Sequence, residues 1–493
     1  MRHYGKGLVS ILLAIVLVLT AVPILAIGKP KTVTAMHVVD FTDDSRDHAT
    51  KFEYSDDYFT GNGYQYRDDL AKVSLGMNYA AGSSQDAKIK GDIKNEDQNW
   101  KSFMKQMDFK DIESNEWMKE LPQSDSIGVC AAQKTIKDKK GKATLIAIGV
   151  RGSNYRGEWG GNARLDKTGN HKGFDLCKDQ TLDYMKQYIA ENGIKGRIKV
   201  WISGYSRAAA TSNLVGGALD DGYVLNKNVT FAPEDLYCYC FETPKGATKE
   251  EVQDKKYDNI HNIVNPSDVV TYVGMKDWDF ARYGVDHLIP AIGDPGYEDM
   301  DAKMIARLST IYNDIGNKNP ADSIEASKPI PELYDTFLTL ACNAVGSREE
   351  YVDKFQEPVV KAMYTYFAAE DHGGQNAFTN HLEAAISNHA TEIFNAALSP
   401  TKSAVDTAIE AVLSDLRKEN MTTLTLEEVK SVLKDAIIPM AVKMVAEDPT
   451  TTFELLKNAS LIGQCHSQCL TESWLFTLPD GYMASHTAYS YQY

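Results

Sequence analysis

The stretch Val200-Trp201-Ile202-Ser203-Gly204-Tyr205-Ser206-Arg207-Ala208-Ala209-Ala210 changes character in its middle. The apolar run before Gly204 is typical of a buried strand, and the small residues after Ser206 favour a helix packed closely on a sheet. A sharp strand-to-helix turn of this kind lifts a serine hydroxyl clear of the sheet. The turn crowds the residues two before and two after the serine, and Gly204 and Ala208 are both small. The pattern therefore predicts that Ser206 is a nucleophile.

The alternative is that Ser203 or Ser206 is an ordinary helix cap, because serine is a favoured residue at that position. Ala208 also stands where the bare G-x-S-x-G motif has its second glycine. The apolar run before the turn and the small-residue segment after it favour the nucleophile.

Short apolar runs alternate with helical segments on both sides of this turn, which predicts a mostly parallel sheet covered on both faces. The expected strands are 143–150, 197–203, 236–242 and 259–265, and the expected helices are 174–192 and 207–219. Before them, residues 66–81 are helix-like and 134–142 look like a polar turn.

Helical periods dominate from residue 297 to residue 460. They cover 300–313, 331–345, 349–369, 376–397, 405–417 and 426–446, with no convincing strand among them. Because another candidate catalytic segment follows, this region is expected to be an all-helical insertion within one α/β fold. The expected division is 36–296, with an N-terminal extension, then the insertion 297–460, then a return of the first domain over 461–493.

The first residues carry the pattern of an export signal. Arg2, His3 and Lys6 precede an apolar run over 8–27, as in a secretory signal peptide. The run is also close to the length that spans a bilayer. We expect export, with residues 1–35 either a signal peptide or an N-terminal membrane anchor.

The charge and cysteine content of the chain argue against some classes of binding partner. A net charge of −16 over 493 residues argues against nucleic-acid binding, which requires clustered lysine and arginine. It gives no support for tight docking on anionic lipid either. Seven cysteines leave at least one thiol unpaired within a monomer, and their spacing does not favour a metal site.

Several motifs, in order, resemble those of the bacterial class 3 lipase-like family of α/β-hydrolases. They are Val150-Arg151-Gly152-Ser153 (like F-R-G-T/S), His171-Lys172-Gly173-Phe174 (like H-x-G-F), the Ser206 turn, Glu242-Thr243-Pro244-Lys245 (like G-S-P-R) and Asn265-Pro266-Ser267-Asp268-Val269-Val270 (like N-x-x-D-x-V). The resemblance covers about residues 143–290 and a short piece near the carboxyl end. It departs from the family at Tyr205, which replaces the usual histidine, at Ala208, and in the large insertion.

The resemblance implies an α/β-hydrolase. Because the insertion separates Asp268 from His466, both of its ends must return to the catalytic edge of the sheet, and it is expected to be a cap over the site. The alternative is that its helices form a core of their own and only decorate the fold. Asp268 follows the expected strand 259–265, at the strand end where α/β folds place their sites. Its local competitors are Asp258, Asp277, Asp279 and Asp286, and the plain alternative is a turn-forming aspartate.

The order Ser–Asp–His places the catalytic histidine after Asp268. His466 lies shortly before Trp474-Leu475, which resembles the family's H-S/Y-P-x-x-Y-x-x-W-L stretch, and it is the expected base. His287 and His486 remain alternatives, while His372, His381 and His389 fall in the helical insertion.

An acyl-transfer enzyme also needs donors for the oxyanion. The backbone N–H of Arg207 is the generic first donor, and the resemblance makes Ser153 the second, with a turn serine after Gly152 as the alternative. The sequence thus predicts an exported serine hydrolase of carboxylic esters, most of all lipid esters, with no cofactor or metal. Its partner would be a lipid or small ester, with transient contact at a lipid interface. Another acyl-transfer enzyme (a peptidase or acyltransferase) and a non-catalytic surface-binding module are the rival readings.

Overall fold

A computed structural model describes residues 29–39, 47–82, 97–120, 122, 125–153, 156–314, 331–366, 375–434 and 437–493. Residues 1–28 of the export signal expected over residues 1–35 lie outside this set. Within the described residues, no helix is both long enough and apolar enough to cross a membrane.

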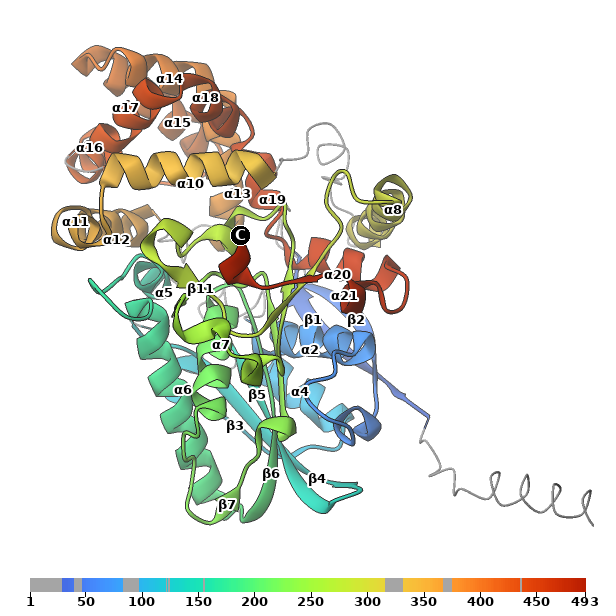
Figure 1. Cartoon of the computed structure of the whole chain (residues 1–493). Helices are drawn as coiled ribbons and strands as arrows, with labels where there is room; N and C mark the ends of the chain where they lie inside the picture. The colour runs from blue at the N-terminus through green and yellow to red at the C-terminus, as the bar shows by residue number, and fades with distance from the viewer. Residues whose placement is uncertain are drawn as a thin grey trace, which may run out of the picture.

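The described part of the chain forms one sheet of nine strands (Figure 1). They are β3 (Lys110–Ser114), β4 (Val129–Asp138), β5 (Gly141–Val150), β6 (Gly196–Tyr205), β7 (Val229–Thr230), β8 (Leu236–Phe241), β10 (Ile260–Val264), β12 (Val285–Leu288) and β13 (Thr487–Ala488). The strands β5, β6, β8, β10 and β12 run parallel to one another. Antiparallel strands close the edges, with β3 and β4 at one end and β13 at the other. The carboxyl ends of the parallel strands therefore meet at one edge, where α/β folds place their sites.

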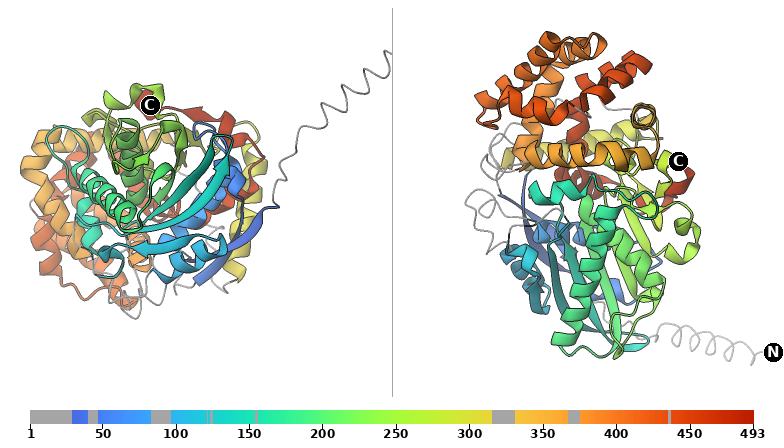
Figure 2. Two further views of the ribbon diagram at one scale, coloured as in Figure 1. Left: turned by 90° about the horizontal axis from the view of Figure 1, so that it is seen from below. Right: turned by 90° about the vertical axis from the view of Figure 1, so that its left-hand side faces the viewer.

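Helices cover both faces of this sheet (Figure 2). On one face lie α6 (Lys172–Glu191) and α7 (Arg207–Asp220), and on the other α2 (Asp68–Ala81) and α4 (Gln98–Gln106), with α20 (Gln468–Thr477) beside α2. Alternation along β6 divides the core, because Val200 and Ile202 pack with α6 and α7 while Trp201 packs with α2. The predicted α/β class with a mostly parallel, doubly covered sheet is confirmed.

The prediction of a polar turn over 134–142 was wrong in extent, because most of these residues belong to strands. Strands β4 and β5 form a long antiparallel hairpin whose register runs from Val129↔Val150 to Asp138↔Gly141. Lys134 is satisfied within the strand, since its ammonium group donates to the Met107 carbonyl at 2.8 Å and pairs with Asp56 at 2.6 Å. Polar residues at the edge of the sheet interrupt the apolar pattern of β4, so the sequence did not indicate a strand there. The hairpin of β1 (Lys31–Val38) and β2 (Asp47–Tyr54) beside α2 was not predicted either.

The described residues of the insertion form helices joined by turns and short loops, with no strand among them. Its helices are α8 (Tyr297–Asp314), α10 (Pro331–Val345), α11 (Arg348–Glu350), the π-helix η9 (Tyr351–Phe355), α12 (Gln356–Tyr366), α13 (Gln375–Asn388), α14 (Ala390–Leu398), α15 (Lys402–Lys418), α16 (Leu426–Leu433), α17 (Ile437–Glu447), α18 (Pro449–Lys457) and α19 (Ala459–Gln464). Helix α10 lies across the carboxyl edge of the sheet, and α14–α18 form the layer farthest from it (Figures 1 and 2).

Smaller elements complete the chain. They are α5 (Arg156–Gly161), α21 (Tyr482–Ser485), and the short strands β9 (Ala247–Thr248) and β11 (Phe280–Ala281), which pair with each other. All seven cysteines are buried. Cys238 and Cys240 face the same side of β8, with their sulfurs 3.5 Å apart, as strand alternation predicts.

Candidate active site

Ser206 occupies the sharp junction between β6 and α7. Its backbone has φ 59° and ψ −126°, a conformation that residues other than glycine rarely adopt and that costs about 1–3 kcal/mol. Its N–H donates to the Phe241 carbonyl at 2.9 Å, so the neighbouring strand β8 holds the turn in place. The side chain makes no capping bond to α7, and the Ser203 hydroxyl donates to Tyr239 inside the sheet. Ser206 stands at the N-cap position of α7, but neither serine caps the helix through its side chain.

The crowding predicted around this turn is present. A Cβ on Gly204 would lie 2.2 Å from the carbonyl oxygen of Ala208 and 2.7 Å from the nitrogen of Ala209. Both contacts are backbone atoms, so neither can rotate away. Glycine is required at position 204, and the fully buried Ala208 fits at the other side of the turn.

The structure brings together the three side chains expected to form the triad. The Nε2 atom of His466 lies 2.8 Å from the Ser206 Oγ, and its Nδ1 atom lies 2.6 Å from the Asp268 Oδ2. The Asp268 side chain is fully buried, whereas that of His466 is 24% exposed. The imidazole is thus held between a buried carboxylate and a serine hydroxyl that solvent can approach.

Asp268 is oriented by the loop that follows β10. Its Oδ1 accepts from the Val270 N–H at 2.9 Å, capping the short 3-10 helix η7 (Val269–Tyr272). The Thr271 hydroxyl donates to the Asp268 carbonyl at 2.8 Å. These contacts leave Oδ2 directed to His466.

His466 lies in the turn between α19 and α20. Its N–H donates to Gly463 at 3.0 Å, and the Tyr205 hydroxyl donates to its carbonyl oxygen at 3.1 Å. Tyr205 also packs its ring 5.4 Å from the imidazole. This departure from the family motif therefore tethers the histidine-bearing turn to the nucleophile turn. The same turn separates Cys465 from Cys469, so these two cysteines, although four residues apart, do not lie on one helix.

The alternative histidines make other contacts. His287 is buried, with Nε2 3.0 Å from His261 and Nδ1 2.9 Å from the Met483 carbonyl, and burial lowers its pKa to about 4. His486 stacks on Tyr482. His389 pairs with Asp415, His381 lies on α13, and His372 lies outside the described residues.

Two of the four competing aspartates make contacts elsewhere, and Asp277 lies in the 3-10 helix Lys276–Trp278. Asp286 forms a fully buried ion pair with Arg282, and Asp258 accepts from the Tyr489 hydroxyl. Asp279 ends a short 3-10 helix in a left-handed conformation.

The loop after β5 carries Ser153 beside the nucleophile turn. A Cβ on Gly152 would lie 3.3 Å from the Tyr205 carbonyl oxygen, which shows how closely the two loops approach. The Ser153 hydroxyl accepts from the Asn162 amide at 2.9 Å, so its own hydrogen is free to donate elsewhere. Sequence reasoning missed Asn162, because its link to Ser153 depends on the fold of the intervening loop.

A buried ion pair supports this loop. Arg151 and Glu158 approach to 2.8 Å with both side chains fully buried, and Arg151 also donates to the Trp117 carbonyl at 2.8 Å. The Arg207 guanidinium instead donates to Ser126 and Cys177. Only the backbone N–H of Arg207, at the first position of α7, remains suited to the role expected for this residue.

Glu242 is a further buried acid at the site that sequence reasoning did not single out. It follows β8 with a positive φ of 46°, at the position where the G-S-P-R motif has glycine. An acid in place of that glycine was the signal that could have identified it.

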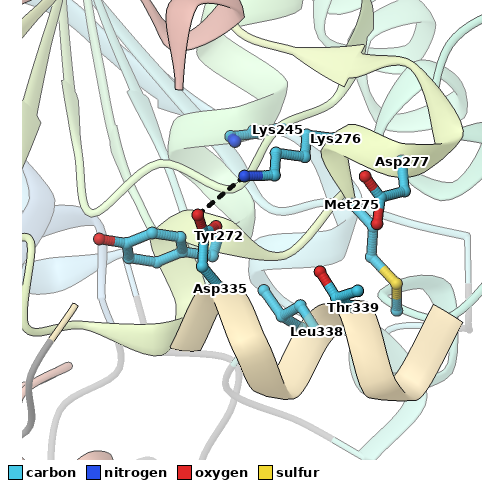
Figure 3. A pocket seen from close by; sticks show the side chains of 8 residues that line it. All are labelled: Lys245, Tyr272, Met275, Lys276, Asp277, Asp335, Leu338 and Thr339. Carbon is cyan, nitrogen blue, oxygen red and sulfur yellow. Dashed lines mark hydrogen bonds and ion pairs between the residues drawn. The ribbon is translucent and has the colours of Figure 1, made fainter. Parts of the chain in front are cut away.

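A small cavity lies between the loop after Asp268 and α10 (Figure 3). Its volume of about 10 Å³ holds at most one water molecule. Lys276 and Asp335 form an ion pair across it at 2.8 Å. None of the triad side chains lines it, so it is not an acyl pocket. Among the described residues, no cluster of three or more His, Cys, Asp or Glu is arranged to hold a metal ion.

The strand order and the nucleophile turn together define an α/β-hydrolase fold. No protein-family model matches the chain, and no curated protein matches it in sequence. Several solved lipases resemble part of it. A triacylglycerol lipase whose catalytic centre is a serine protease triad shares 18% identity at a TM-score of 0.29, over 45% of this chain and 80% of that one.

Two further similar structures are lipases of the fungi Rhizomucor miehei and Rhizopus microsporus. The triacylglyceride lipase of Rhizomucor miehei shares 16% identity at a TM-score of 0.27, over 45% of this chain and 79% of its own. The lipase of Rhizopus microsporus var. chinensis shares 14% sequence identity at a TM-score of 0.28, over 45% of this chain and 75% of its own. These TM-scores are too low to carry activity or substrate over to this chain. These neighbours also give no support to the bacterial family that the motifs of this chain resemble.

Proposed function

We propose that this protein is a serine hydrolase that cleaves carboxylic esters through an acyl-enzyme. The observation that carries the proposal is the continuous hydrogen-bonded line from Asp268 through His466 to Ser206. A nucleophile, a base and a residue that orients the base are the parts that acyl transfer by serine requires.

In the proposed mechanism the Ser206 oxygen attacks the ester carbonyl carbon while His466 Nε2 accepts the hydroxyl proton. Asp268 holds the Nδ1–H tautomer and stabilises the imidazolium. The N–H of Arg207, with the N–H and hydroxyl of Ser153, stabilises the tetrahedral oxyanion. His466 returns its proton to the leaving alcohol, and then deprotonates the water that hydrolyses the acyl-serine.

The strained turn supports an enzyme over a non-catalytic binding module. Holding Ser206 at φ 59° costs folding energy, and such strain persists where function requires it. A binding surface on the same fold would need neither that backbone nor the alignment of His466.

We further propose a lipid ester as the substrate and an exported location for the protein. The motif resemblance and the helical layer over the site support the first, and the basic-then-apolar N-terminus supports the second. The net charge of −16 fits transient contact with a neutral lipid interface better than stable docking on anionic lipid.

Replacing Ser206 by alanine tests the proposal. We expect hydrolysis of a short p-nitrophenyl ester to fall by several decades, because the attacking oxygen is lost. The melting temperature should move by no more than about 2 °C, since the hydroxyl contributes little packing. Activity of Ser206→Ala within about tenfold of the parent would exclude Ser206 as the nucleophile.

A further inference from the structure

Glu242 lies where the segments carrying the three proposed triad residues meet. One carboxyl oxygen accepts from the Asn265 N–H at 2.8 Å, three residues before Asp268. The other accepts from the Thr471 hydroxyl at 2.8 Å, and Thr471 also contacts the Tyr205 hydroxyl at 3.1 Å. The side chain thus joins the aspartate loop, the helix after His466 and the nucleophile turn.

The Glu242 carboxyl group is also within hydrogen-bonding reach of Asp268 itself. Both side chains are fully buried, and two adjacent carboxylates in such a place cannot both ionise without a large cost. Burial, and then the neighbouring charge of Asp268, raise the pKa of Glu242 well above its usual range, which the bonds from Asn265 and Thr471 oppose. The direction of this shift favours the neutral, protonated form of Glu242 beside the Asp268 carboxylate.

A neutral carboxylic acid has one O–H donor and retains lone pairs for the bonds from Asn265 and Thr471. Asp268 already accepts from the Val270 N–H on one oxygen and faces His466 with the other. It can accept a further bond, and Glu242 has the donor in reach.

We propose that Glu242 is a positioning residue of the triad, which donates a hydrogen bond from its neutral carboxyl group to the Asp268 carboxylate. This inference rests on the proposed function for its catalytic meaning. The bond fixes the aspartate and withdraws part of its charge from the imidazole. The titratable group that acts directly on Glu242 is Asp268. His466 is reached only through Asp268, and Tyr205 only through Thr471.

Two substitutions separate this role from general packing. Glu242→Gln keeps the shape and supplies an N–H donor in place of the O–H. Glu242→Gly removes the side chain but suits the positive φ of 46°, so the turn should survive. Glu472→Gln is the matched control, because Glu472 is another fully buried acid, on α20, that contacts Thr50, Tyr79 and Arg307 instead.

The measurement is the pH profile of kcat/KM, whose acid limb reports protonation of the essential base in the free enzyme. Glu242→Gln should retain kcat within about threefold and leave the acid limb in place. Glu242→Gly should lower kcat about tenfold or more with little change in KM, and should move the acid limb to higher pH, because the unshared Asp268 charge stabilises the imidazolium more. Glu472→Gln should lower the melting temperature and leave the limb unchanged.

The ring signal of His466, followed by NMR with ¹³C-labelled histidine and assigned by its loss in His466→Asn, gives the same comparison without substrate. If no ester is hydrolysed but this signal shifts as predicted, the positioning role stands and the proposed function fails. If both Glu242 variants move the titration to lower pH, Glu242 carries a negative charge and the proposal is overturned. Titrations identical in parent and both variants would overturn it as well.

Discussion

At the scale of single residues, neighbouring groups of the protein hold the side chains of the candidate site in place through hydrogen bonds. Asp268 uses one oxygen for the Val270 N–H and the other for His466. Ser153 is arranged similarly, because the Asn162 amide occupies a lone pair of its hydroxyl and leaves the hydrogen to donate. Preorganised donors of this kind stabilise the charge that develops in a transition state.

Ser153→Ala tests that arrangement. We expect kcat to fall by about 10²-fold, because one donor to the oxyanion is lost, while KM changes little. The backbone N–H of residue 153 remains, so the loss should be smaller than for Ser206→Ala. Steady-state kinetics on a p-nitrophenyl ester measure both constants, and an unchanged kcat would show that the hydroxyl takes no part.

At the scale of elements, the junction of β6 and α7 determines where the Ser206 side chain lies. Gly204 and Ala208 leave no room for another side chain between strand and helix. The Ser206 N–H bond to Phe241 links this turn to the end of β8. The geometry of one turn therefore follows from packing against its neighbours as well as from its own sequence.

The two small residues of the turn should respond differently to substitution. Gly204→Ala should lower activity by more than about a hundredfold and destabilise the fold by about 1–3 kcal/mol, because the new methyl group overlaps backbone atoms. Ala208→Gly should retain activity and cost no more than about 1 kcal/mol. Denaturant melts with parallel ester assays compare them, and equal behaviour of the two variants would contradict the crowding.

The sequence predicted elements best where apolar periodicity was uninterrupted. The expected strand 143–150 became β5 (Gly141–Val150), and the expected helix 331–345 matches α10. Prediction failed where tertiary contacts satisfy polar residues, as for Lys134 in β4. A local side-chain bond sets the start of α20, since the Ser467 hydroxyl accepts from the Cys469 N–H at the N-cap position.

The residues of the candidate site also differ in how far the sequence could predict them. Ser206, Asp268 and His466 could be proposed from sequence because each belongs to a local motif at a chain position that the fold class makes meaningful. The contacts of Glu242 with Asn265 and Thr471, and of Asn162 with Ser153, join segments that only the folded chain brings together. No local pattern encodes such contacts.

At the scale of the whole molecule, the inner helices of the insertion are tied to the hydrolase loops. The Tyr334 hydroxyl on α10 donates to the Ser267 carbonyl at 2.8 Å, next to Asp268, and Tyr351 donates to the Ala163 carbonyl at 2.8 Å. Arg307 on α8 pairs with Glu472 on α20. The outer side of α10 instead packs Phe337 against Met440 and Met444 of α17. The insertion thus has a core of its own as well as a face toward the site.

We expect this inner face to act as a cap over the acyl chain of the substrate. Activity on long-chain esters should rise when a neutral detergent or lipid interface is present, because a cap that opens there admits the chain. Hydrogen exchange of α8 and α10 should slow when an acyl-phosphonate occupies Ser206. Unchanged exchange, together with rates that do not depend on chain length, would make the insertion a structural appendage.

Reaction with a fluorophosphonate, followed by mass-spectrometric mapping of the modified residue, tests whether Ser206 is an activated nucleophile. We expect a single adduct on Ser206, because the reagent reacts with an activated hydroxyl. The adduct should be lost in His466→Ala and retained in His287→Ala, since only His466 contacts the serine. An adduct on another residue, no adduct on the folded protein, or labelling that depends on His287 rather than His466 would contradict the account.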